Sequence, residues 1–212
     1  MRVVGTLLAA VCAAGLHGCL ATPAPTEVPV LASAQISADL GDHSLGRVGL
    51  LPVQVLDAQP LNASFKSAQL SSIFHSEFAR AASFELLQLG AREMEAVAQS
   101  DPFRRGRYEL EMLVELGRRF RLDALLIVHV ADQRVYAPQM LSAQAELVSL
   151  TTGGVLWSGQ VHLDAADPRV TEGLEVFYSD AIGGEVTGPW TLSLHSPERF
   201  ARFGAWQLAQ VF

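Results

Sequence analysis

Hydrophobic residues recur along the chain at two spacings, one typical of helices and one typical of strands. Residues 67–82 and 108–120 place apolar side chains three and four positions apart, which predicts two amphipathic helices. The stretch 123–131 reads Asp-Ala-Leu-Leu-Ile-Val-His-Val-Ala and is apolar on both faces. Such a run predicts a central strand that is covered on both sides. The same reading predicts three shorter elements: strands at 47–55 and 84–89 and a helix at 91–99.

From residue 139 the hydrophobic period changes to two. Apolar and polar side chains alternate on either side of the turn 151–154. This pattern predicts an antiparallel hairpin over 139–164, with one face packed on a core and the other face more exposed to solvent.

A last helix is predicted over 196–210, and its start is clearly marked. Ser196 can cap the helix, Pro197 suits the first helical position, and Glu198 follows in the first turn. The chain shows no internal repeat and no second domain boundary. The elements together predict the α/β class: one three-layer-like domain over 46–212, in which helices pack on a mixed β-sheet.

The N-terminal end has the pattern of a bacterial export signal. Arg2 precedes an apolar run that ends at Leu16, and this run is shorter than the ~20 residues that span a bilayer. We therefore predict a signal peptide over 1–18. Leu16-His17-Gly18-Cys19 resembles the lipobox, which predicts lipidation of Cys19, although His17 departs from the small residue usual there. The alternatives are plain secretion with cleavage near Ala21 and an uncleaved anchor.

Residues 19–45 are predicted to form a flexible tether behind the lipid. The part from 20 to 40 holds three prolines and few large side chains, too little to build a core. Leu20 follows the cysteine instead of aspartate, which in enterobacteria implies sorting to the outer membrane. The predicted location is the cell envelope, on the periplasmic face of the outer membrane.

Composition narrows the classes of function. Hydrophobic residues make up 50% of the 212 residues and charged residues 17%, which excludes a disordered chain. The net charge of −7 comes with no basic stripe and argues against nucleic-acid binding. If Cys19 is acylated and Cys12 leaves with the signal, the mature chain has no thiol nucleophile and no disulfide.

Three stretches carry a resemblance to known envelope proteins. These are Arg47-Val-Gly-Leu-Leu-Pro-Val, Leu122-Asp-Ala-Leu-Leu-Ile-Val-His-Val and Leu147-Val-Ser-Leu-Thr-Thr-Gly-Gly-Val-Leu-Trp-Ser. They resemble the strands and hairpin of the CsgG-type curli-secretion and LpoB-type lipoproteins, over about 47–164. The resemblance implies an α/β domain similar to the N-terminal domain of TolB. Such strand and turn motifs are specific for a fold and poor guides to function.

The resemblance implies a lipoprotein that binds or assembles other envelope components without catalysis. A subunit of an oligomeric secretion apparatus is an alternative. A curli-type pore is not predicted, because the connections at 136–139 and 151–154 are too short for barrel segments.

Candidate catalytic chemistry is sparse. The chain has no glycine-rich phosphate loop, no His-Glu-x-x-His and no Gly-x-Ser-x-Gly. His162, Asp164 and Asp167 form the best cluster and give the alternative of a hydrolase or a metal-binding domain. Asp167-Pro168 is also an ordinary helix start, and no cofactor is predicted. His129 is predicted to be a core histidine with its hydrogen bonds satisfied.

Two features are candidate contacts with a partner. Trp190 follows Gly-Pro in a stretch without helical or alternating pattern, unlike Trp157, which falls on the apolar face of its strand. Arg104, Arg105 and Arg107 form either a solvated loop or a contact with anionic headgroups or glycan. The sequence names no specific protein partner, and an oligomer is possible.

Overall fold

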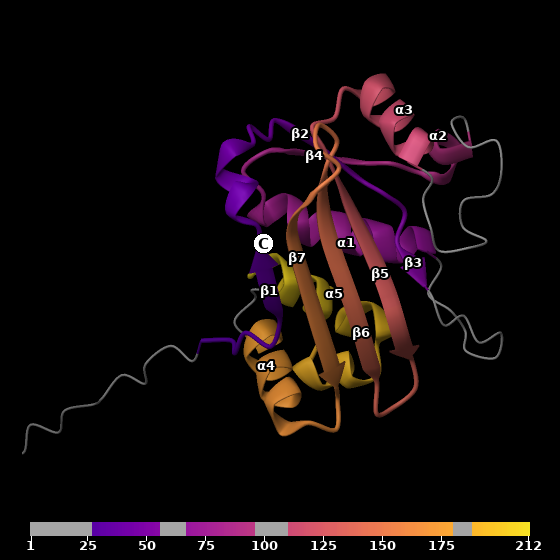
Figure 1. Ribbon diagram of the computed structural model, residues 1–212. Coiled ribbons are helices and arrows are strands. Elements are labelled where there is room, and N and C mark those ends of the chain that lie inside the picture. Colours follow the sequence, from indigo (N-terminus) through magenta and orange to yellow (C-terminus); the bar gives the residue numbers. More distant parts are fainter. Residues whose placement is uncertain (1–26, 56–66, 96–109, 180–187) are drawn as a thin grey trace, which may run out of the picture.

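The computed structural model describes residues 27–55, 67–95, 110–179 and 188–212, and these parts form one α/β unit (Figure 1). The strands are β1 (Ser33–Ile36), β2 (Arg47–Leu50), β3 (Gln54–Val55), β4 (Glu85–Gln88), β5 (Ala124–Arg134), β6 (Met140–Ser149) and β7 (Val155–Asp164). The helices are α1 (Ser67–Ala81), α2 (Ala91–Glu95), α3 (Leu110–Phe120), α4 (Pro168–Ser179) and α5 (Pro197–Ala209), with short 3-10 turns η1 (Ala38–Asp42) and η3 (Trp190–Leu194). No helix in these ranges is long and apolar enough to cross a membrane.

All the strands share one mixed sheet, as predicted. Its order is β1-β7-β6-β5-β2-β4, and β3 pairs with β5 beyond the end of β2. β2 runs parallel to β4 and β5, whereas β5, β6, β7 and β1 are antiparallel neighbours. The apolar run 123–131 is the central strand β5, which confirms its prediction.

The predicted strand 47–55 is divided into β2 and β3. Pro52 lies in the gap, and proline has no N–H group to donate to a ladder. Val53 instead bonds to α1: its N–H donates to Ser71 Oγ at 2.8 Å, and its carbonyl accepts from Ser67 Oγ. The start of α1 therefore interrupts the strand.

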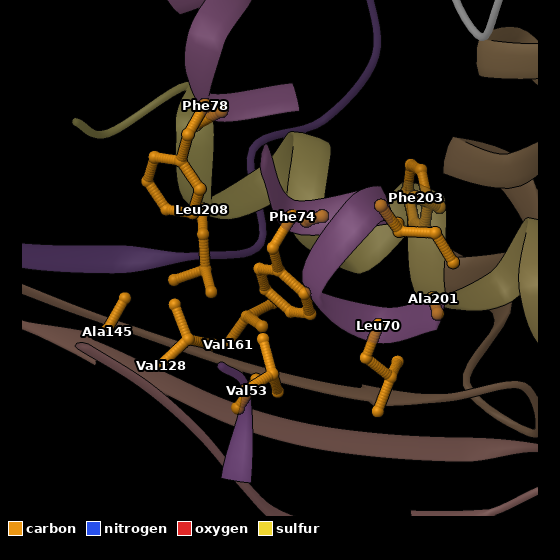
Figure 2. Packing of buried hydrophobic residues seen from close by; sticks show 14 of the residues in the cluster. Val53, Leu70, Phe74, Phe78, Val128, Ala145, Val161, Ala201, Phe203 and Leu208 are labelled. Atoms are coloured by element: carbon orange, nitrogen blue, oxygen red, sulfur yellow. The ribbon is translucent and has the colours of Figure 1, made fainter. Parts of the chain in front are cut away.

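The main core lies between the sheet and helices α1, α4 and α5 (Figure 1). Figure 2 shows Phe74 and Leu70 of α1 above Val128 and Val161 of the sheet, with Phe203 beside them. A smaller core covers the other face, but only at the end of the sheet near β2 and β4. Its buried members are Leu51, Leu89, Met94, Met112, Leu116, Leu122, Leu125 and Ile127. Within the described parts of the chain, three layers therefore exist only at that end.

The predicted tether boundary at residue 45 is wrong, because the fold begins earlier. β1 pairs with β7, and Val28 is buried in the main core. The side chain of Gln207 holds the segment: its Oε1 accepts from Leu31 N at 2.6 Å, and its Nε2 donates to the Pro29 carbonyl at 2.8 Å. The predicted signal peptide 1–18 and the tether as far as residue 26 lie outside the described residues.

The terminal helix agrees with its prediction. Ser196 Oγ accepts from Arg199 N at 3.3 Å, and Pro197 stands at the start of α5. Phe200, Phe203 and Leu208 are buried, as its apolar surface requires. The preceding helix α4 had been visible only as the start signal at Asp167-Pro168.

Candidate binding surfaces of the sheet

His162, Asp164 and Asp167 each have a separate partner. His162 Nδ1 lies 2.6 Å from Ser142 Oγ on the neighbouring strand. Asp164 Oδ1 accepts from Ala166 N at 2.9 Å, and Asp167 forms a 2.8 Å ion pair with Arg169. Hydrogen bonds from Arg169 hold the pKa of Asp167 below its usual range, so this carboxylate stays ionised at the start of α4.

These partners give each of the three side chains a separate protein contact. Within the described ranges, no three His, Cys, Asp or Glu side chains gather where they could hold a metal ion. Asp167 serves as a helix start, since its carboxylate accepts from Arg169 N at 2.9 Å. The hydrolase alternative named the same three side chains.

The structure places the other candidate residues in different environments. Trp157 is buried, and its indole N–H donates to the Val211 carbonyl at 2.7 Å, which confirms the core interpretation. Trp190 lies half-buried in η3, so its role as a contact residue stays a prediction. Cys19 and the arginines at 104, 105 and 107 lie outside the described residues.

One face of the sheet is polar and carries no described helix along β6, β7 and β1; Figure 1 shows α1 and α5 behind these strands. Register partners point to the same face of a sheet, so the pairing defines rows of side chains. One row crosses five strands and consists of Gln54, His129, Gln144, Gln160 and Ser33. A second row consists of Glu146, Ser158 and Gln35. An open hollow of about 330 Å³ is lined by the whole second row and by Ser33, Gln144 and Gln160 of the first, and Glu146 is the one charged residue among its described lining.

At the inner end of the first row, two side chains have buried polar atoms without a hydrogen-bond partner among the described residues. Gln54 is 6% exposed, and neither its Oε1 nor its Nε2 has a hydrogen-bond partner. The Nε2 atom of the neighbouring His129 is also buried without a partner, so the prediction of a satisfied histidine is wrong. Burial lowers the pKa of His129 and the Glu146 carboxylate opposes the shift, so the imidazole is neutral at pH 7.

Replacing Gln54 by leucine should raise the free energy of unfolding by about 1 to 3 kcal/mol, because it removes a buried amide that has lost its hydration. Urea denaturation measures the change. Gln207→Leu is the matched control: Gln207 is also buried but holds Leu31 and Pro29, so its loss should destabilise by a similar amount. A lower stability for Gln54→Leu would show that Gln54 has a partner in solution.

A pocket of about 280 Å³ with aromatic lining residues lies on the other side of the sheet, where β7 pairs with the edge strand β1. Trp157 and Leu147 come from the sheet, Phe84 follows α1, and Phe212 follows α5. The remaining lining residues are Leu40, His43, Leu45, Ala81, Ala82 and Ser83. Phe212 contacts three rings edge to face, with centroid distances of 4.8 Å to Trp157, 5.0 Å to Phe78 and 5.8 Å to Phe84.

Comparison with known proteins gives relatives by structure only. No model of a known protein family matches the chain, and no curated protein matches it. The PelC dodecamer from Paraburkholderia phytofirmans superposes with a TM-score of 0.41 at 12% identity, over 67% of this chain and 89% of that one. Lipoprotein GNA1162 from Neisseria meningitidis gives 0.42 at 16% identity, over 67% and 99%.

Escherichia coli LpoB, solved by NMR, gives a TM-score of 0.41 at 16% identity, over 77% of this chain and 83% of that one. The chain is structurally similar to LpoB, as its strand and turn motifs indicate, and also to the Neisseria lipoprotein and to PelC. This similarity is one of fold and assigns no activity or partner.

Proposed function

We propose that this protein is an envelope lipoprotein that binds another protein and does no catalysis. A lipid on Cys19 would hold it at the periplasmic face of the outer membrane. The residues up to 26 would tether the domain, which begins near Val28. The single observation that favours protein binding is the exposed edge of β1, the first strand after this tether.

β1 is an edge strand. It pairs with β7 on one side, no described strand pairs with its other side, and all four of its residues are exposed. An exposed edge offers unpaired backbone donors and acceptors, to which a strand of another protein can add. Two apolar side chains lie exposed along the same segment, Val30 at 54% and Ile36 at 65%. Their exposure favours an edge that is covered in a complex.

A photo-crosslinking amino acid in place of Ile36 tests the proposal in intact cells. We expect one discrete adduct on irradiation, which mass spectrometry identifies as an envelope protein or as a second copy of the chain. Leu110 is the matched control, since it is apolar and 70% exposed but lies on α3, away from the edge. Equal adducts at both positions, or none at Ile36, would contradict the proposal.

A further inference from the structure

The pocket beside β1 has rigid aromatic walls. The Trp157 indole is fixed by its 2.7 Å hydrogen bond to the Val211 carbonyl and is buried on its strand. The Phe212 ring is held edge to face between Trp157 and Phe84. Walls that are already in place lose little conformational entropy when a ligand enters, so the pocket is built for binding.

The pocket adjoins the exposed edge. Ile36 of β1 is the register partner of Trp157, so the aromatic wall lies one strand inside the edge. η1 follows β1 directly and supplies Leu40, another lining residue. A segment that extends along β1 towards η1 therefore approaches the pocket where Leu40 lines it.

We propose that the pocket receives one aromatic side chain from an extended segment of the partner that adds to β1. This inference rests on the proposed protein-binding function and names the chemistry that the partner must bring. In strand addition the backbone hydrogen bonds supply affinity, and pockets for single side chains supply specificity.

The shape and chemistry of the pocket favour an aromatic occupant. Phe84, Trp157 and Phe212 line the pocket, and aromatic pairs prefer edge-to-face contacts at centroid distances of roughly 4.5 to 7 Å. The lining contains no Lys, Arg, Asp or Glu, which favours an uncharged occupant. The two polar side chains that line the pocket are Ser83 and His43. Both can form hydrogen bonds with the partner's backbone on either side of an inserted ring.

The test is a short probe that does not depend on the natural partner. A capped pentapeptide with central azidophenylalanine, flanked by valine and serine, is photolysed with the full-length protein in its membrane. We expect the label on pocket residues, in competition with the same peptide carrying phenylalanine but not with the one carrying alanine. Better competition by laurate than by the phenylalanine peptide would reassign the pocket to an acyl chain and overturn the proposal.

Two tryptophan variants give the matched comparison. Ala81 lines the pocket and is exposed at the end of α1, so Ala81→Trp should fill the pocket without disturbing the core. It should lower labelling by about tenfold, the loss of one aromatic anchor. Ala68→Trp, also exposed but at the other end of α1, should leave labelling unchanged. Equal labelling in both variants would overturn the proposal.

The two proposals fail in different ways. Peptide labelling in the pocket without an adduct at Ile36 would contradict the protein-binding function, and with it the partner segment at β1, but would still show that the pocket takes an aromatic side chain. An adduct at Ile36 that Ala81→Trp does not weaken, together with no peptide labelling, would contradict the pocket alone.

Discussion

Replacing Phe203 by alanine is expected to lower the free energy of unfolding by about 3 to 5 kcal/mol, the usual cost of truncating an enclosed phenylalanine. Phe203 has no exposed surface. Its ring centroid lies 5.4 Å from that of Phe177 on α4 and 6.2 Å from that of Trp206. A Cβ atom built on Gly173 would lie 2.9 Å from Phe203 Cζ, so α4 packs directly on this ring. The cavity that the missing Phe203 ring leaves cannot close unless α4 moves. The expected loss of stability is therefore large.

Urea denaturation of the two proteins measures this difference. Leu192→Ala is a suitable control, because Leu192 is apolar but 45% exposed, and such a change should stay within about 0.5 kcal/mol. A loss below about 1 kcal/mol for Phe203→Ala would mean that α5 does not pack on the sheet in solution and instead awaits a partner.

The parts of the fold that the sequence predicts are those with a strong hydrophobic period. The alternation through β6 and β7 predicts the hairpin, since one face is buried and the other is polar. α1 and α5 carry apolar stripes because they cover the main core. In these elements the local pattern and the tertiary contacts require the same residues, so the pattern is sufficient.

β1 and β3 could not be predicted, because their placement depends on distant residues. β1 is exposed at every position, so no apolar period marks it, and its segment is fixed by Gln207 more than a hundred residues away. β3 is separated from β2 because Val53 bonds to serines of α1. Propensity alone assigns the first of these to a tether and the second to one continuous strand.

The binding surfaces illustrate the same limit. His162, Asp164 and Asp167 are close in sequence, but Asp167 pairs with Arg169 at the start of a helix. Closeness in the sequence therefore does not by itself indicate a shared site. The aromatic pocket is the opposite case. Phe84, Trp157 and Phe212 come from three distant segments, and only the fold brings them together. For the polar face of the sheet, the sequence carries one signal, which is Gln54, a polar residue inside a predicted apolar strand.

The strongest effect of any single substitution is expected at Cys19. Diacylglyceryl transfer requires its thiol, and the cleaved product would begin with this cysteine carrying about three acyl chains. One chain holds a protein at a membrane only marginally, whereas two or more hold it stably, because each buried methylene contributes ~0.8 kcal/mol. Anchoring should therefore be lost completely, and not in part, when this one sulfur is removed.

Cys19→Ala should abolish incorporation of labelled palmitate and leave the protein uncleaved or in the soluble fraction. Cys12→Ala is the matched control and should change neither, because Cys12 lies inside the predicted signal peptide and leaves with it. The folded domain should keep its stability in both variants, since its first buried residue, Val28, lies beyond the predicted lipid site. Metabolic labelling followed by membrane fractionation distinguishes the outcomes. A wild-type protein that takes no label, or a Cys19→Ala protein that still takes it, would mean that His17 prevents lipobox processing, and the protein would then need another route to the membrane.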